Sequence, residues 1–243
     1  MYKAEGVKPY NSTDKREQVE RMFNSIAHSY DLLNHSLSLG IDRRWRRKAI
    51  DMLGRFAPQE VLDIATGTGD LAIMQARRNH PRRIVGADIS DGMMEVARQK
   101  VEKAGLSDVI TFRKEDCTHM SFPDDSFDAV TSSYGVRNFS DLDAGLREMW
   151  RVLRPGGHLL IVELSTPVRF PMKQLFSIYA HVVMPVLGRL ISHDDSAYTY
   201  LPRSMEAFPQ AEEMEQILRR NGFTQVRWER FCGGISTMYL ATK

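Results

Sequence analysis

The sequence predicts an α/β fold, a doubly wound and mostly parallel seven-stranded sheet with a helical cap at its N-terminus and an antiparallel hairpin at its C-terminus. Three observations predict it. Short apolar runs alternate with amphipathic stretches through the middle of the 243-residue chain, as buried parallel strands alternate with helices. The first of these runs ends in a glycine-rich turn. Two late apolar runs follow one another with no helical pattern between them, which is typical of a hairpin.

The first 57 residues are expected to form a helical cap segment. A helix over about residues 13–27 is predicted by apolar side chains on one helical face, at Val19, Met22, Phe23 and Ile26. After a polar break at residues 34–38, a second helical pattern contains Ile41, Trp45, Ala49, Met52 and Leu53 and ends before Pro58. Residues 58–243 are expected to form one compact domain, because α/β folds of roughly 250 residues are common as single units.

The strands and helices of the domain follow in β-α order. Apolar runs beginning at Val61, Ile84, Val109, Phe127 and His158 read as parallel strands. Helices are predicted at residues 70–78, 92–104 and 142–153. The last two runs, at residues 223–231 and 236–242, are joined through Gly233 and Gly234 and predict the hairpin.

Composition excludes several function classes. The 33 basic and 31 acidic side chains nearly balance, so bulk attraction to a nucleic acid is not expected. Two distant cysteines, Cys117 and Cys232, form neither a zinc nor an iron–sulfur motif, and no metal is expected. The polar N-terminus does not look like a signal peptide, and the longest apolar stretch, residues 178–191, is too short and interrupted to span a bilayer. A cytoplasmic protein is expected.

The glycine-rich turn predicts a nucleotide-like ligand. Gly67 and Gly69 lie between the first strand and its helix, where a backbone without side chains lets a ligand approach. Asp88, about 20 residues further on, ends the next strand, where doubly wound folds place the acid that binds ribose hydroxyls. This pair of features fits a dinucleotide or S-adenosylmethionine. The alternative is a turn that serves packing only.

Later segments favour S-adenosylmethionine. Glu115-Asp116-Cys117 follows the third strand, residues 121–128 lead into the fourth, and residues 152–157 turn into the fifth. In this series the chain resembles class I S-adenosylmethionine-dependent methyltransferases, whose sheet ends in an antiparallel hairpin. Nicotinamide-dependent dehydrogenases share the first turn but not the later segments, so hydride transfer is the minority interpretation.

Within that class the chain resembles the UbiE/MenG family of quinone-biosynthesis C-methyltransferases almost end to end. Three segments carry the resemblance: Phe23 to Asn34 matches F-x-x-I-A-x-x-Y-D-x-x-N, Ser133 to Asn138 matches S-F-G-x-R-N with Tyr134 for Phe, and Asp194 to Leu201 matches D-x-x-x-Y-x-Y-L. Thr66 and His193 also depart from familiar members. The departures at Tyr134 and His193 leave the substrate preference open.

The resemblance implies which residues bind S-adenosylmethionine, the co-substrate. Asp88 would accept from the ribose hydroxyls and Asp116 from the adenine amino group, and the backbone N–H of Cys117 would face a ring nitrogen. Contacts in the turn and beside the methionine moiety complete the set: Thr68, Gly67, Gly69 and Ser133.

The implied reaction is methylation of a ring carbon. A quinone is too electron-poor for this, whereas a quinol deprotonated at one oxygen has a nucleophilic ring carbon; since a phenol has a pKa of about 10, a nearby base or cation must favour the anion. Arg137 is the favoured candidate, with an ion-pair or surface role as its alternative. The candidates for assisting it are Tyr30, Asp31, Asn138, Asp194 and Tyr200. No histidine is expected to be the base.

The expected substrate is a prenylated quinol, in first place demethylmenaquinol. A ubiquinone precursor or dual specificity is the alternative, and a non-catalytic S-adenosylmethionine-binding assembly partner is the alternative from another class. Residues 166–210 are expected to be an insertion that forms a substrate channel, in which the apolar residues 176–187 serve either as core or as the wall around an isoprenoid tail. A lipid substrate also implies transient contact with a membrane surface.

A nucleic-acid substrate is disfavoured. The segment after the fourth strand lacks the N/D-P-P-Y/F motif of amine-methylating nucleic-acid enzymes. The basic run at residues 43–48 is interpreted mainly as the solvated face of a helix, because Ile41, Trp45 and Ala49 alternate with its charges. The sequence does not determine the oligomeric state, and a homo-oligomer is one of the options.

Overall fold

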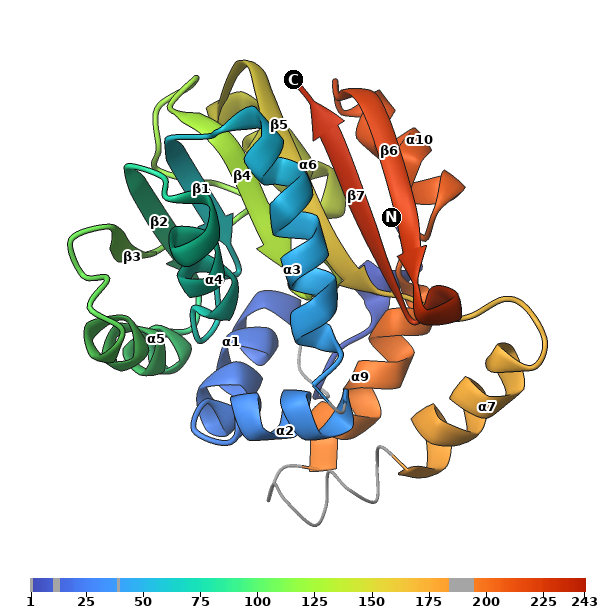
Figure 1. Cartoon of the computed structure of the whole chain (residues 1–243). Helices are drawn as coiled ribbons and strands as arrows, with labels where there is room; N and C mark the ends of the chain where they lie inside the picture. The colour runs from blue at the N-terminus through green and yellow to red at the C-terminus, as the bar shows by residue number, and fades with distance from the viewer. Residues whose placement is uncertain (1, 11–13, 39, 184–194) are drawn as a thin grey trace.

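One mixed sheet organises the molecule. The computed structural model describes residues 2–10, 14–38, 40–183 and 195–243. Its seven strands lie in the order β3-β2-β1-β4-β5-β7-β6 (Figure 1). Their bounds are β1 Glu60–Ile64, β2 Arg83–Asp88, β3 Ile110–Lys114, β4 Phe127–Ser133, β5 Leu153–Leu164, β6 Thr224–Phe231 and β7 Ser236–Thr242. Strands β1 to β5 run parallel, and β7 is antiparallel to both β5 and β6, which confirms the predicted sheet and hairpin.

The strands form where they do because their side chains are buried on both faces. All five residues of β1 are buried; Leu62 and Ile64 pack into one core layer, and Val61 packs into the other. From β1 the chain adds β2 and β3 on one side of the sheet and then crosses to add β4 and β5 on the other side, so the strand order reverses at β1. Ligands of doubly wound sheets bind outside the carboxyl ends of the strands at such a point.

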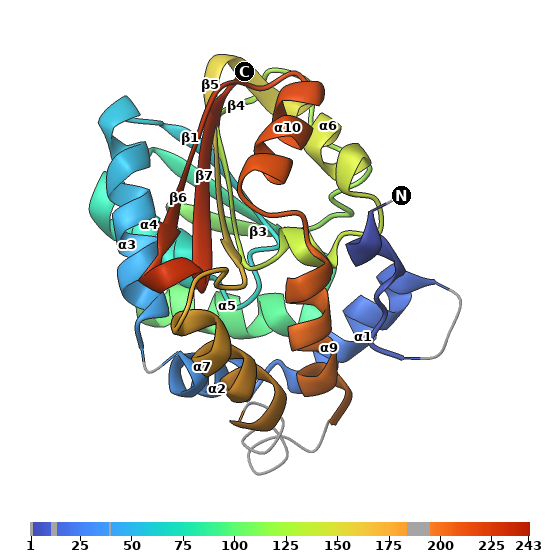
Figure 2. The same cartoon turned by 90° about the vertical axis from the view of Figure 1, so that its right-hand side faces the viewer.

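Helices cover both faces of the sheet (Figures 1 and 2). One core layer contains residues of α3 (Asp42–Leu53) and α4 (Asp70–Asn79), and the other contains residues of α6 (Leu142–Val152) and α10 (Glu212–Arg220). Helix α5 (Asp91–Lys103) is capped at its N-terminus by Ser90, whose side chain accepts a hydrogen bond from Met93 N over 3.2 Å. The predicted helices α4, α5 and α6 are confirmed within a residue at each end.

The N-terminal segment contains one helix more than the sequence predicts. The 3-10 turn η1 (Lys3–Gly6) and helix α1 (Lys15–Ile26) come first, and α2 (Tyr30–Leu37) then covers most of the expected polar break at residues 34–38. The prediction of a break is wrong because α2 contacts the rest of the protein through polar side chains, Asp31 and His35. Helix α2 lies at the carboxyl end of the parallel strands (Figure 1).

The chain leaves the sheet between β5 and β6. Helix α7 (Met172–Ile178) continues into a π-helical turn, η4 (Tyr179–Val183), and α9 (Asp195–Ala207) leads back towards the sheet. Three short 3-10 turns complete the described elements: η2 Gly54–Phe56, η3 Val136–Asn138 and η5 Cys232–Gly234. No helix of the described residues is long and apolar enough to cross a membrane. The division into a cap at 1–57, a domain at 58–243 and a channel insertion at 166–210 stays a prediction.

Candidate active site

The glycine-rich turn holds the end of β2. Gly67 has a φ of 56°, a left-handed conformation that favours glycine, and a Cβ built there would meet nothing within 4 Å. Gly67 N donates to Asp88 Oδ2 over 2.8 Å, and Ser90 N donates to Asp88 Oδ1 over 2.9 Å. Each carboxylate oxygen is therefore fixed by one backbone N–H and keeps a further lone pair for a ligand. Burial raises the pKa of Asp88, and the backbone hydrogen bonds oppose that rise.

A pocket opens beside this turn, and most of the predicted cofactor residues line it. Gly67, Asp88, Asp116, Cys117 and Ser133 all face it. Thr68 and Gly69 do not line the pocket, although both belong to the same turn. Its other lining residues include Tyr30 and Asn138, which the sequence assigned to catalysis, and Arg16, Val19 and Phe23 of α1, which it did not assign.

Helix α1 closes the pocket at the Asp116 end. Arg16 Nη1 lies 2.8 Å from Asp116 Oδ2, and the backbone N–H and hydroxyl of Thr118 both donate to Asp116 Oδ1. Partial burial alone would raise the pKa of Asp116, but these bonds hold it below its usual value. Burial raises the pKa of the Cys117 thiol well above its usual value, so nothing in its surroundings activates the thiol as a nucleophile.

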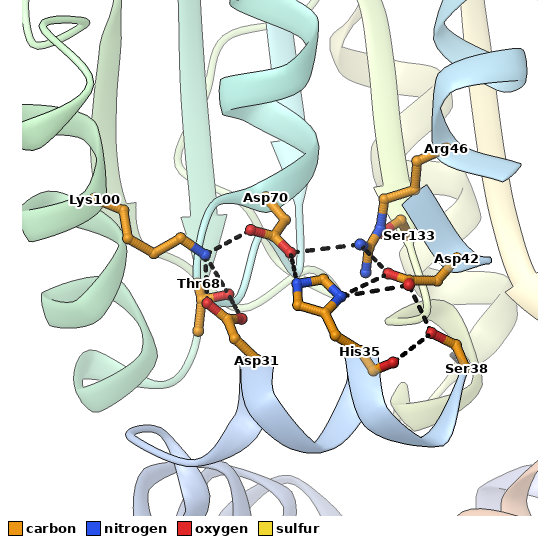
Figure 3. Close-up of polar contacts among 9 residues, drawn as sticks. All are labelled: Asp31, His35, Ser38, Asp42, Arg46, Thr68, Asp70, Lys100 and Ser133. Atoms are coloured by element: carbon orange, nitrogen blue, oxygen red, sulfur yellow. Dashed lines mark hydrogen bonds and ion pairs between the residues drawn. The ribbon is translucent and has the colours of Figure 1, made fainter. Parts of the chain in front are cut away.

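Helix α2 is fixed to the turn by charge (Figure 3). Lys100 Nζ lies 2.5 Å from both Asp31 Oδ2 and Asp70 Oδ1, and the Thr68 hydroxyl donates to Asp31 Oδ1. His35, one turn further along α2, lies between Asp42 and Asp70, with ring nitrogens 3.4 and 3.5 Å from their carboxylates. Thr68 thus contacts α2 directly, and Asp31, a candidate for assisting catalysis, is engaged in this contact.

Arg46 corrects the interpretation of residues 43–48 as a solvated face. Four of the five basic side chains in this segment are exposed: Arg43, Arg44, Arg47 and Lys48. Arg46 is 4% exposed instead, and its Nε donates to Ser133 Oγ over 3.1 Å while Nη1 lies 2.7 Å from Asp42 and 3.4 Å from Asp70. Its guanidinium also stacks over the Tyr134 ring, 4.9 Å from the centroid.

The sequence contained a signal for this buried position. Asp42, Arg46 and Ala49 fall at i, i+4 and i+7, on the buried face of α3. Asp70, which joins the same cluster, is also affected by the burial. Burial alone would raise its pKa, but Arg46 and Lys100 beside it hold that pKa below the usual value.

Arg137 is buried and paired. Its Nη1 lies 2.8 Å from Glu163 Oε1 and also donates to the carbonyl of Tyr134, while its backbone N–H donates to Glu163 Oε2 over 3.1 Å. Its Nε has no hydrogen-bond partner among the described residues. The ion-pair interpretation therefore accounts for the contacts of Nη1 and leaves Nε as an unused donor. Arg137 itself does not line the pocket.

Two tyrosines and an amide lie beside Arg137. The Tyr200 hydroxyl donates to Asn138 Oδ1 over 3.0 Å, so α9 contacts the turn after β4. Burial raises the pKa of both Tyr30 and Tyr200, with the positive charge of Arg137 opposing the rise. Both are phenol donors at neutral pH rather than bases. Asp194, the remaining catalytic candidate, lies outside the described residues.

Comparisons with known proteins agree with this geometry. The sequence model of the ubiE/COQ5 methyltransferase family matches residues 11–243. A demethylmenaquinone methyltransferase of Bacteroides fragilis is 57% identical over 243 residues, which cover all of this chain and 99% of the relative. The ubiquinone/menaquinone biosynthesis C-methyltransferase UbiE of Geobacter sulfurreducens is 43% identical over 96% of this chain and 91% of its own. The crystal structure of the [4+2]-cyclase SpnF shares the fold, with a TM-score of 0.67 at 18% identity over 96% of this chain and 97% of that one.

Proposed function

The chain belongs to the ubiE/COQ5 methyltransferase family, and from this premise we propose that it transfers a methyl group from S-adenosylmethionine to a ring carbon of demethylmenaquinol. One observation of the structure supports the proposal above all. Asp88, Asp116 and Ser133, from three different strand ends, converge on a single pocket together with Tyr30 of α2. The carboxylates in this pocket are acceptors suited to a nucleoside. The phenol of Tyr30 and the amide of Asn138 in the same pocket are donors suited to a second substrate that carries oxygen atoms.

The residues present fit S-adenosylmethionine. The fixed carboxylate of Asp88 would accept from both ribose hydroxyls, and the open space at Gly67 leaves room for the ribose. Asp116 would accept from the adenine amino group once the half-exposed Arg16 side chain moves aside. Ser133 would hold the methionine end, and Arg46, which does not line the pocket and pairs with Asp42 and Asp70, would hold the Ser133 side chain in place.

The same fit defines what the chain must do for the second substrate. S-adenosylmethionine, when bound, supplies an electrophilic methyl group on a sulfonium. The protein has to place a quinol ring against that methyl group and favour the phenolate form of the ring. Arg137 does not line the pocket and its Nε is buried, so a local rearrangement on substrate binding would have to bring a water or the ring oxygen to this unused donor, through which Arg137 would stabilise the phenolate. Asn138 and Tyr200, already joined by a hydrogen bond, would orient the ring oxygens.

Arg137 can do this although Glu163 neutralises it. The Glu163 carboxylate is 1% exposed and is fixed by the backbone N–H groups of Arg137 and Leu164 as well as by the guanidinium. This arrangement holds the guanidinium in one orientation and leaves Nε as a donor that is unpaired among the described residues. The proton leaves to solvent or to a nearby acceptor.

Substrate competition tests the proposal. The chain would be given short-tailed demethylmenaquinol and a matched 2-polyprenyl-6-methoxy-1,4-benzoquinol together with labelled S-adenosylmethionine under reducing conditions, and the products would be identified by mass spectrometry. We expect methylated naphthoquinol as the main product. A larger yield of methylated benzoquinol would replace the naphthoquinol proposal with the ubiquinone-precursor alternative.

The same experiment addresses the non-catalytic alternative. An assembly partner that only binds S-adenosylmethionine would form neither product, yet the ligand would still raise its melting temperature, because a ligand that binds the native state stabilises it. That combination would contradict the proposed function. The similarity to demethylmenaquinone methyltransferases over the whole chain favours an enzyme.

A further inference from the structure

Helix α7 and turn η4 present an apolar face to solvent. Over residues 172–183 the side chains of Phe176 and Ala180 are buried, as expected for one inward face of a helix. The opposite side is also apolar, and its exposed side chains recur at helical spacing: Leu175, Ile178 and Val182. A helix that is apolar on both sides is normally surrounded by protein or by lipid. Among the described residues, no protein covers the outer side.

The loop before α7 extends this surface. Val168 and Phe170 are exposed, and Phe170 has the largest exposed fraction of the exposed large apolar side chains at 81%. We define the α7 face as the exposed side chains of Phe170, Leu175, Ile178 and Val182, whereas Val168 lines the hollow between α7 and α9 together with Phe176 and Ala180. Several exposed apolar side chains in one surface are a recognised sign of an interaction site, whereas single ones are normal on any protein.

The charges beside the α7 face favour an anionic partner. Arg169 and Lys173 are exposed and form no ion pair with another described residue; Lys173 also borders the hollow between α7 and α9. No acidic residue occurs in the sequence between Glu163 and Asp194. On the adjoining helix α9, Glu206 is exposed, lines the same hollow as Lys173 and is engaged in an interaction of its own. An apolar strip with flanking cations matches an anionic bilayer, in which lipid phosphates pair with the basic side chains and acyl chains receive the apolar ones.

The place of the α7 face in the fold agrees with this partner. Both views place α7 and α2 at the same end of the molecule, the carboxyl end of the parallel strands (Figures 1 and 2). The pocket of Asp88 and Ser133 opens at this end. Leu32 of α2 adds a further exposed apolar side chain there. A protein resting on a bilayer through this end would keep its pocket close to the lipid phase.

We propose that the α7 face, with Arg169 and Lys173, docks the protein on the surface of an anionic phospholipid bilayer. This goes beyond the proposed function, because it assigns a surface and a partner rather than a reaction. The docking requires neither S-adenosylmethionine nor a quinol. Phe170 and Ile178 enter the interfacial layer, and the two cations contact the phosphates.

Vesicle flotation with a matched pair of variants tests the proposal. The chain contains Arg-Phe twice in exposed positions, at Arg169-Phe170 on the α7 face and at Arg55-Phe56 in η2 at the other end of the sheet. The test variant is Arg169→Glu/Phe170→Ser, and the control is Arg55→Glu/Phe56→Ser. A second test variant, Ile178→Ser, changes the helix itself. Vesicles of phosphatidylethanolamine and phosphatidylglycerol, without any quinone, are compared with phosphatidylcholine vesicles.

The expected result is flotation of the wild-type and control proteins with the anionic vesicles. The partition coefficient of the Arg169→Glu/Phe170→Ser variant should be at least about tenfold lower, since one basic residue near an anionic surface contributes about fivefold and the variant also introduces an acid and removes an exposed aromatic ring. Unchanged melting temperatures would show that all variants fold. Equal flotation of the test and control variants, or a wild-type protein that remains in solution, would overturn the proposal.

A different occupant gives a different result. If a second copy of the chain covers the α7 face, the test variants will change the sedimentation mass and leave vesicle flotation unaltered, which also overturns the proposal. Because the vesicles contain no quinone, a failure of the proposed methyl transfer cannot produce any of these outcomes.

Discussion

Arg46 and Ser133 join the N-terminal helices to the sheet: Nε of Arg46 in α3 donates to Oγ of Ser133 at the end of β4 over 3.1 Å (Figure 3). The same guanidinium contacts Asp42 and Asp70. A residue of the N-terminal segment therefore contacts a side chain that lines the candidate cofactor pocket. The cap and the sheet are coupled through the place where the methionine end of S-adenosylmethionine is proposed to bind.

Arg46→Met should weaken both folding and S-adenosylmethionine binding. Removing one partner of a buried ion pair leaves its carboxylates uncompensated, which costs about 3–5 kcal/mol of unfolding free energy. Urea unfolding and calorimetry would measure the two effects. Arg44→Met, an exposed position on the same helix, is the control and should change neither. Equal behaviour of the two variants would show that the Arg46 cluster matters to neither property.

Asp88→Ala should remove most S-adenosylmethionine affinity while leaving the fold intact. Each hydrogen bond to a charged group contributes about 1.5–3 kcal/mol, so the loss of two ribose contacts should raise the dissociation constant by about a hundredfold or more. Calorimetry gives the constant directly. Asp91→Ala, three residues further on and 62% exposed, is the control. An unchanged constant for Asp88→Ala would refute the ribose assignment.

Arg137 needs a variant that does not leave Glu163 unpaired. We expect Arg137→Met combined with Glu163→Gln to fold, because both buried charges are removed together. Its turnover should fall by about a hundredfold, a typical effect of losing one preorganised donor, with a nearly unchanged dissociation constant for S-adenosylmethionine. Wild-type turnover in this double variant would make Arg137 and Glu163 a structural pair only.

Asp63 should make stability depend on pH. It is 1% exposed, accepts from the hydroxyls of Thr66 and Thr131, and burial raises its pKa to about 6. The unfolded-state pKa is about 3.9, so between these values the folded state binds more protons and the unfolding free energy falls as the pH rises. The fall through this window is about 3 kcal/mol, since each pKa unit corresponds to 1.36 kcal/mol.

The variant Asp63→Asn isolates this contribution. Its amide does not titrate, so the difference in unfolding free energy between variant and wild type should grow in the variant's favour from about pH 4 to about pH 6. Urea unfolding at both pH values measures it, and the other titrating groups cancel in the comparison. A difference that stays constant with pH would contradict the raised pKa of Asp63.

The sequence predicted the sheet well because buried parallel strands have a simple pattern. Runs such as residues 61–65 and 158–164 are almost wholly apolar, and the glycines between strand and helix identify the ligand end. Motif resemblance supplied some of the residues that line the pocket, among them Asp88, Asp116 and Ser133, but not those of α1. Apolar runs and motifs are both local patterns in the sequence, and such patterns were sufficient to predict the strands and part of the pocket.

What the sequence missed depends on contacts between distant residues. Helix α2 looked like a break because its polar side chains, Asp31 and His35, face Lys100 and Asp70 instead of solvent. Arg46 looked solvated because four neighbouring basic side chains are. The pairing of Arg46 with Asp42 is local and follows helical spacing, but its other partners, Asp70 and Ser133, lie 24 and 87 residues away, and Lys100 lies 69 residues from Asp31. A periodicity argument cannot reach such distant partners.

The redox requirement of methyl transfer tests the account most directly. Labelled S-adenosylmethionine would be incubated with short-tailed demethylmenaquinone, with and without a reductant, and any new methyl group would be located by mass spectrometry. The account predicts methylation of a ring carbon only when the quinone is reduced, because only the quinol can provide a nucleophilic ring carbon. Equal transfer to the oxidised quinone, or no transfer to the quinol while S-adenosylmethionine still raises the melting temperature, would contradict it.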